Sequence, residues 1–257
     1  MRHFLSLAEI GPDNLAGLVR HSLEIAAVGG ARADLLAGKA VGIYFRGTST
    51  RTRTAFTVGA LRSGASIISY GPNDLQVATG ETLQDTGRVL GGYLDALVIR
   101  TNSPDEEMRA LAVAMTPGMR LTLVTPEGYG LPSAALETAE RFARLTGAVV
   151  EHHHDAHRLP SGVDAVYTTR WQTMGVPKPD PDWRERFRPL AVTRELMARV
   201  SKPSGTIFLH DLPAVRGEDV VDEVLDGPQS RAFVQARHKM TSATAVLSWC
   251  IGAGADD

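Results

Sequence analysis

The stretch AVGIYFRGTSTRTRTAFTVGALRSG (Ala40–Gly64) joins an apolar run to a helical pattern through a segment rich in hydroxyl groups and arginines. The N-terminus of a helix presents unpaired backbone N–H groups and a partial positive charge. Ser49, Thr50 and Thr52 add hydroxyl donors there, and the guanidinium fork of Arg51 suits a phosphate group. The stretch therefore predicts a strand, a loop that binds an anion, and a helix. A solvated arginine at a helix start is the alternative for Arg51.

Arg53 is expected to have a structural role. Two residues along a helix correspond to a turn of about 200°, so Arg53 cannot share the face of Arg51.

The same alternation of short apolar runs and helical patterns continues along the chain and predicts an α/β fold with parallel sheets. The predicted strands are Ala40–Phe45, Ala65–Tyr70, Ala96–Arg100, Arg120–Val124, Ala148–His152, Ala165–Thr168 and Gly205–Leu209. The predicted helices are Asp13–Ala27, Arg53–Ser63, Glu81–Gly91, Ser133–Leu145, Thr193–Ala198 and Ser242–Ile251.

Length and composition limit the function classes. The chain has 257 residues, 43% of them hydrophobic, and a formal net charge of −2, which gives no indication of a nucleic-acid partner. No apolar run approaches the ~20 residues of a membrane span, and the N-terminus does not resemble a signal peptide. The single cysteine, Cys250, excludes an internal disulfide and fits a reducing compartment. We expect a cytoplasmic protein without membrane partners.

Four segments together carry a family resemblance: Ser49–Arg53 (STRTR), Gly80–Thr101, Arg170–Gly175 (RWQTMG) and His210–Ser230 (HDLPAVRGEDVVDEVLDGPQS). The chain resembles the aspartate/ornithine carbamoyltransferase family over residues 3 to 247, and the last two segments favour the ornithine branch. The resemblance implies two parallel-sheet subdomains and transfer of a carbamoyl group from carbamoyl phosphate to the amine of ornithine or a similar amino acid. It places the protein in arginine metabolism and amino-acid biosynthesis, and we expect no cofactor.

By this resemblance, Ser49, Thr50, Arg51 and Thr52 hold the phosphate, and Thr52 also faces the carbonyl oxygen. Arg100 is the second arginine on carbamoyl phosphate. Such a reaction mainly requires a neutralised phosphate, a held oxyanion and a positioned amine.

The amine substrate is assigned to the second half. Met174 and Gly175 match the family loop that closes over ornithine, and Thr173, just before them, is assigned to the same site. His210, Leu212 and Pro213 match the His-Cys-Leu-Pro stretch of the family, in which a backbone carbonyl meets the carbamoyl NH₂. Asp211 stands at the position of the Cys in that stretch and is also assigned to the amine site.

The next residues extend the resemblance. Arg216 is expected to support the loop rather than to touch substrate, and Gly217 and Glu218 continue the match. The segment Arg216–Asp219 also reads as a helix start with acids in its first turn.

The chain departs from the family in one block. The sequence passes almost directly from Arg100 to the strand Arg120–Val124, and the His-Pro-x-Gln motif of the family is absent. An internal deletion predicts that the second subdomain lacks its first strand and helix, so its sheet must repack, borrow a strand or be unstable. We expect subdomains at residues 1–114 and 115–240, with a C-terminal helix in 241–257 packing back on the first.

Three substitutions accompany the deletion. Thr169 replaces a family Asp, Thr173 replaces a Ser, and Asp211 replaces a Cys. Asp211 either takes over holding the substrate amine or reflects drift in a site no longer under selection.

Three readings of the function follow: an ornithine carbamoyltransferase-type enzyme, a catalytically impaired anion-binding or regulatory subunit, and a truncated product without stable function. The segment Gly80–Asp85 lies where the mobile loop of the family reaches into the site of a neighbouring subunit. This implies a homotrimer, with a full-length paralogue as another possible partner; a plain helix start is the alternative reading of the segment.

The run His152–His154 with His157 suggests a metal site. Adjacent residues on a strand point to opposite faces, so we expect no metal site there.

Overall fold

The computed structural model describes residues 2–30, 32–45, 47–75, 80–100, 115–172 and 177–253. The chain divides into two compact units. Unit 1 comprises Met1–Ser103 and Arg237–Asp257, and unit 2 comprises Pro104–Ala236. The boundaries expected from the sequence lie after residues 114 and 240. No helix within the described ranges is both long and apolar enough to cross a bilayer.

Unit 1 is built on a parallel sheet of three strands. Its central strand is almost entirely buried, because five of its six residues are apolar or glycine and both of its edges carry a neighbour. The strands, in spatial order, are β2 (Ser66–Tyr70), β1 (Ala40–Phe45) and β3 (Ala96–Arg100).

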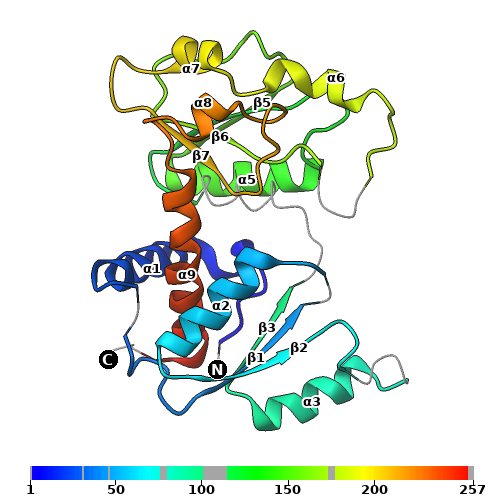
Figure 1. Ribbon diagram of the computed structural model, residues 1–257, viewed down its shortest axis with the longest axis vertical. Coiled ribbons are helices and arrows are strands. Elements are labelled where there is room, and N and C mark those ends of the chain that lie inside the picture. The colour runs from blue at the N-terminus through cyan, green and yellow to red at the C-terminus, as the bar shows by residue number, and fades with distance from the viewer. Residues whose placement is uncertain are drawn as a thin grey trace. The chain divides into compact units, whose positions relative to one another are not determined.

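Two helices follow strands of this sheet: α2 (Thr50–Arg62) and α3 (Leu83–Tyr93). In Figure 1 they lie on opposite sides of the sheet. The register pairs Phe45 of β1 with Arg100 of β3, so both strands end at the same edge. The chain enters α2 from that edge, which brings the helix N-terminus to the carboxyl ends of β1 and β3.

The first and the last described helix of the chain meet in unit 1. Helix α1 (Leu7–Ala27) is interrupted at Gly11, whose φ is 74°. The part of helix α9 (Ala232–Ile251) that belongs to unit 1 contacts α1, where Ser22 Oγ lies 3.0 Å from Thr241 Oγ1. The hydroxyl pair joins these two helices within one unit.

The described strands of unit 2 form two parallel pairs. Strand β4 pairs with β5, and β6 pairs with β7; no ladder among the described residues joins the two pairs. The residues of β4 and β6 are half-buried or exposed, unlike those of β1. These strands are β4 (Arg120–Val124), β5 (Val149–His153), β6 (Ala165–Thr168) and β7 (Ile207–His210).

Four α-helices and one 3₁₀ turn belong to the described part of unit 2, apart from the start of α9. They are α5 (Ser133–Thr146), α6 (Trp183–Phe187), η2 (Arg188–Leu190), α7 (Arg194–Val200) and α8 (Asp222–Leu225). Figure 1 shows α5 on one side of the strands and α6 to α8 on the other. A cluster around Phe208 of β7, with Val220 and Leu225, forms a core between β7 and α8.

All seven predicted strands exist, and none is displaced by more than two residues at either end. The α/β class is confirmed. The predicted C-terminal helix Ser242–Ile251 begins ten residues earlier, at Ala232. The reading of Arg216–Asp219 as a helix start is wrong, because α8 begins at Asp222 with Val221 as its N-cap. Gly217 instead takes a φ of 82°, which glycine adopts without strain, in the turn before that helix.

Candidate functional site

The N-terminus of α2 and the end of β3 meet in unit 1. Arg100 Nη1 donates a hydrogen bond to Ser49 Oγ at 2.6 Å, although 51 positions separate the two residues. Ser49 is the N-cap residue of α2, but its side chain caps no helix N–H group. The first turn of α2 contains no acidic residue that would neutralise the helix dipole. This edge of unit 1 therefore concentrates hydrogen-bond donors and positive charge, as an anion site requires.

The other predicted phosphate residues lie on the first turn of the same helix. Thr50 is exposed, and Arg51 and Thr52 are partly buried. The structure thus brings Ser49 and Arg100 together, and places Thr50, Arg51 and Thr52 beside them along the chain.

Arg53 turns toward the end of β1 instead. Its Nη2 donates to the carbonyl of Phe45 at 3.3 Å, and its guanidinium lies 5.3 Å from the centroid of the Phe45 ring. These contacts agree with the structural role expected from the helix geometry.

The loop after β7 in unit 2 is organised by a buried histidine and a buried aspartate. His210 Nε2 lies 2.8 Å from Asp219 Oδ2, and both side chains are almost fully buried. The backbone N–H of Leu212 donates to His210 Nδ1 at 2.7 Å, and that of Val215 donates to Asp219 Oδ1 at 2.7 Å. Because Nδ1 accepts a hydrogen bond, the ring proton resides on Nε2 and is donated to Asp219. His210 therefore holds the loop in place.

Leu212, in this loop, has a φ of 55°, a backbone conformation that favours glycine. Non-glycine residues held in this left-handed conformation cluster at binding and catalytic sites. Asp211 Oδ1 lies 3.6 Å from His210 Nδ1, and the Asp211 side chain is 18% exposed. The loop fixes the backbone of Asp211 and Leu212 while leaving part of the Asp211 carboxylate accessible.

Arg216 braces the same loop from outside. Its guanidinium pairs with Asp222 at 2.6 Å and with both carboxylate oxygens of Asp226 at 2.7 and 2.9 Å. Asp226 accepts these bonds in its ionised form, and this lowers the pKa of Asp226. The arrangement agrees with a supporting role for Arg216.

Asp219 is a structural residue of this loop that the sequence pattern does not reveal, because it stands among the acids expected at a helix start. Asp219 is 0% exposed and accepts from both His210 and Val215. The sequence holds a weak indication of this contact. Asp219 lies nine positions after His210 at the end of a strand, and a turn at Gly217 can bring the carboxylate back to the histidine.

His152, in β5, and His154, just past the end of β5, lie close together, with their ring centroids 4.9 Å apart. The sequence argument concerned adjacent histidines, whereas these two are two positions apart. His152 Nε2 lies 2.9 Å from Thr125 Oγ1, and His154 Nδ1 lies 2.9 Å from the Thr125 carbonyl oxygen. Partial burial, followed by the charge of the neighbouring histidines, lowers the pKa of His152. Within the described ranges, no three His, Cys, Asp or Glu side chains gather as metal ligands would.

The start of α3 has the features of an ordinary helix start. Thr82 is its N-cap, and Thr82 Oγ1 accepts a hydrogen bond from the Asp85 N–H at 3.1 Å and donates one to Asp85 Oδ2 at 2.8 Å.

Thr173 and Met174, which the sequence assigns to the amine site, lie outside the described residues.

Comparisons with known proteins identify the family. Residues 2–120 match the model for the aspartate/ornithine carbamoyltransferase carbamoyl-P binding domain, and residues 108–250 match that for the Asp/Orn binding domain. The chain belongs to the aspartate/ornithine carbamoyltransferase family, whose activity is carbamoyl transfer.

Two ornithine carbamoyltransferases are among the similar relatives. The ornithine carbamoyltransferase of Halalkalibacterium halodurans is 31% identical over 302 positions, covering 96% of this chain and 94% of the relative. That of Methanothermobacter thermautotrophicus is 30% identical, covering 98% of this chain and 99% of the relative.

Solved structures have the same fold. The ornithine carbamoyltransferase of Pyrococcus furiosus superposes with a TM-score of 0.83 at 26% identity, covering 98% of this chain and 97% of the other. The anabolic enzyme of Campylobacter jejuni gives a TM-score of 0.85 at 23% identity, covering 97% and 99%, which shows the fold alone.

Proposed function

We propose that this protein transfers a carbamoyl group from carbamoyl phosphate to the amine of ornithine or a similar amino acid, giving a citrulline-type product and phosphate. The carrying observation is the hydrogen bond from Arg100 to Ser49, which joins the tip of β3 to the N-terminus of α2. The end of β3 and the start of α2 are far apart in the sequence. Together they form one edge of unit 1 that is rich in positive charge and in hydrogen-bond donors. A doubly charged phosphate is the ligand that such an edge suits best.

In the proposed reaction, the neutral amine nitrogen attacks the carbonyl carbon of carbamoyl phosphate. The bond from that carbon to the phosphate oxygen breaks, and phosphate leaves with the bonding electrons. The attacking nitrogen then loses a proton. Arg51 and Arg100 offset the charge of the phosphate, with Ser49 and Thr50 as further donors. Thr52 donates to the carbonyl oxygen as negative charge develops on it.

The amine is assigned to unit 2, to Thr173, Met174 and the loop of His210, Asp211 and Leu212. His210 acts through the backbone that it positions, since its ring is enclosed. Replacement of Asp211 by Ala is expected to weaken binding of the amine substrate, measured as a raised KM for ornithine. An unchanged KM would instead favour drift at this position.

We further propose that an internal deletion removed the His-Pro-x-Gln region together with the first strand and helix of the second subdomain. Two observations support it. The alignment with the Halalkalibacterium halodurans relative runs over 302 positions, more than the 257 residues of the chain. Strands β4 and β6 also lack a common ladder among the described residues, as the loss of a central strand predicts.

The deletion favours a second candidate function. Loss of one oxyanion donor costs about 10²–10³ in rate, and the motif would supply more than one group. A catalytically impaired relative that binds carbamoyl phosphate as an anion-binding or regulatory subunit is therefore the alternative to an active enzyme.

A citrulline-formation assay separates the two functions. Turnover of carbamoyl phosphate and L-ornithine at about a thousandth of the rate of a full-length relative supports the enzyme. Calorimetric binding of carbamoyl phosphate without turnover supports the subunit. A broad melting transition with no stabilisation by carbamoyl phosphate contradicts both.

Matched variants test the phosphate site itself. Arg100→Gln is expected to abolish the stabilisation by carbamoyl phosphate, because it removes one charge and the bond to Ser49. Arg20→Gln, at an exposed position on α1, is the control and should bind as the unaltered protein does. Equal thermal shifts for both variants would contradict the assignment of Arg100.

The assembly is proposed from the family resemblance. A homotrimer with shared sites, or a mixed trimer with a full-length paralogue, would let a neighbour complete the site. Light scattering after size-exclusion chromatography tests it, and a monomer at all concentrations would contradict it. A cytoplasmic location is part of the same proposal.

A further inference from the structure

An aromatic cluster in unit 2 is centred on Phe187, the last residue of α6. Phe187 and Trp183 are both buried and lie four positions apart on this helix, so their side chains share one face. Their rings meet edge to face, with centroids 5.8 Å apart. Tyr129, from the loop after β4, packs edge-on against the Phe187 ring at 5.1 Å. The cluster thus joins α6 to the loop after β4.

The Phe187 ring also holds the chain just ahead of the proposed amine residues. Trp171 lies three positions after the end of β6 and two positions before Thr173. Its ring packs against that of Phe187, with centroids 5.6 Å apart and an angle of 36° between the planes. Aromatic pairs at such separations attract each other beyond the effect of surface burial alone. Trp171 is therefore one anchor of the segment that follows it.

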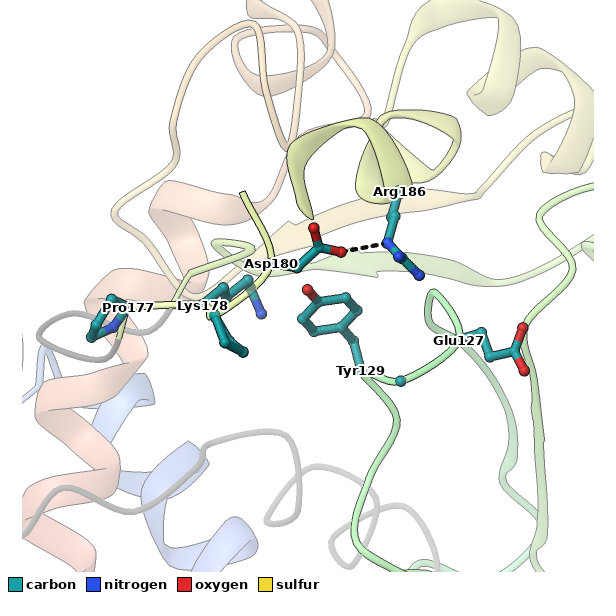
Figure 2. Close-up of a pocket in the computed structure, with 8 residues that line it drawn as sticks. Glu127, Tyr129, Pro177, Lys178, Asp180 and Arg186 are labelled. Atoms are coloured by element: carbon teal, nitrogen blue, oxygen red, sulfur yellow. Dashed lines mark ion pairs between the residues drawn. The ribbon is translucent and has the colours of Figure 1, made fainter. Parts of the chain in front are cut away.

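The same ring holds the chain just after the proposed amine residues. Lys178 lies four positions beyond Met174, and its ammonium is 4.7 Å from the centroid of the Phe187 ring. The ammonium also lies 4.4 Å from the Tyr129 centroid and 5.6 Å from the Trp183 centroid, within the range of cation–π interactions. Figure 2 shows Lys178 beside Tyr129 in the lining of a pocket of about 420 Å³. Lys178 is therefore the second anchor.

A salt bridge fastens the chain after Lys178 to α6. Asp180 Oδ2 pairs with Arg186 Nε at 2.6 Å (Figure 2). Pro177 and Pro179 restrict the backbone on both sides of Lys178. The position of Lys178 is thus fixed both by its own side chain and by the residues around it.

We propose that Phe187 is a positioning residue for the amine substrate, because its ring anchors both ends of the segment that carries Thr173 and Met174. This role rests on the proposed function, which assigns those two residues to the amine. Because Phe187 is buried, it acts through Trp171 and Lys178 rather than by contact with the substrate. Anchoring both ends on one ring limits the conformational entropy that the segment loses when the amine binds.

Hydrogen exchange without substrates tests the anchors directly. Peptides that cover residues 170–178 should exchange faster in Lys178→Met and in Phe187→Leu than in the unaltered protein, because each change removes contacts at an end of the segment. Lys178→Arg keeps a cation over the rings and should exchange as the unaltered protein does. Lys202→Met is the matched control, since Lys202 pairs with Asp164 outside the cluster. Unchanged exchange in Lys178→Met overturns the anchoring, and this half-buried position decides the test if Phe187→Leu does not fold.

Steady-state kinetics test the consequence for the amine. Lys178→Met should raise the KM for L-ornithine by about tenfold and leave the KM for carbamoyl phosphate within about twofold, because the proposed phosphate residues lie in unit 1. Lys178→Arg should restore the KM for L-ornithine. A general loss of folded protein would lower kcat without raising one KM selectively. Equal changes in both KM values, or no change in either, overturn the positioning role.

A calorimetric titration separates failure of this proposal from failure of the proposed function. L-ornithine is titrated in the presence of inorganic phosphate, so that no turnover is required. Equally tight binding to the unaltered protein and to Lys178→Met overturns the positioning role and leaves the proposed function in place. Absence of binding to the unaltered protein contradicts the proposed function and, with it, the role of Phe187 at an amine site, whereas hydrogen exchange still shows whether the anchors exist.

Discussion

At the scale of single residues, buried hydrogen bonds decide which side chains can take part in chemistry. His210 and Asp219 satisfy each other and two backbone N–H groups, so neither is available to a substrate. Ser49 is the opposite case, since its hydroxyl leaves the helix uncapped and meets Arg100. These buried contacts give His210 and Asp219 a supporting role, whereas Ser49 remains a proposed binding residue.

Asp219→Asn is expected to destabilise the protein by about 1–3 kcal/mol, because an amide cannot accept from both His210 Nε2–H and the Val215 N–H without placing a donor against a donor. Chemical denaturation measures the change. Glu218→Gln is the control, since Glu218 makes only a partly exposed pair with Arg184, and it should lie within about 0.5 kcal/mol of the unaltered protein. Similar losses in both variants would contradict the role given to Asp219.

Asp95 gives a prediction about pH. The Ala40 N–H donates to Asp95 Oδ2 at 2.8 Å and Lys39 Nζ lies 3.1 Å from Oδ1, and these contacts lower the pKa of Asp95, the Ala40 bond most. The resulting stability is present above the unfolded-state pKa of about 3.9 and is lost as the pH falls through the lower folded-state pKa.

Asp95→Asn should therefore be less stable than the unaltered protein at neutral pH, and the difference should shrink as the pH falls below about 4. Denaturant titrations at several pH values measure it. A difference that stays constant from neutral to acidic pH would show that the charge of Asp95 contributes nothing.

At the scale of elements, the close approach of α2 and α9 depends on one glycine. A Cβ on Gly59 would lie 2.5 Å from Thr244 Oγ1 and 3.3 Å from the carbonyl oxygen of Met240. Thr244 is fully buried and donates to that same carbonyl, so it has little freedom to move. The crossing of the two helices leaves no room for a side chain at this position.

Gly59→Ala is expected to cost about 1–3 kcal/mol of stability through overpacking. Gly87, an exposed glycine within α3, is the matched control, because a Cβ there meets nothing within 4 Å. Gly87→Ala should stabilise the protein by about 0.5–1 kcal/mol through helix propensity. Thermal melts of the two variants should shift in opposite directions, and a shift of the same sign would contradict this packing.

At the scale of the whole molecule, the two units differ in how their strands are supported. β1 is buried and pairs on both edges, whereas β4 and β6 each have one described neighbour. The core of unit 2 around Phe208 lies between β7 and α8.

Hydrogen exchange followed by mass spectrometry should reveal this asymmetry. Peptides that span β1 are expected to exchange more slowly than peptides that span β4 or β6, because strands with a single partner open at lower free energy. Equal protection of the three strands would indicate that a partner, from this chain or another copy, pairs with β4 and β6 in solution.

The sequence by itself determined the alternation of strands and helices, because burial periodicity and helix-start chemistry are local properties. It also determined the family, since four short segments in matching order carry it. The assignment of residues 49–52 and Arg100 to phosphate binding remains a prediction. The contact between Ser49 and Arg100 supports it.

Only the tertiary structure decided the contacts between positions far apart in the chain. His152 and His154 meet Thr125 across 27 and 29 positions, and Lys178 meets the ring of Tyr129. The pairing of the described strands of unit 2, β4 with β5 and β6 with β7, likewise depends on which strand edges meet in space. A periodic pattern specifies which face of an element is apolar, but the element packed against that face is selected by the free energy of the whole fold.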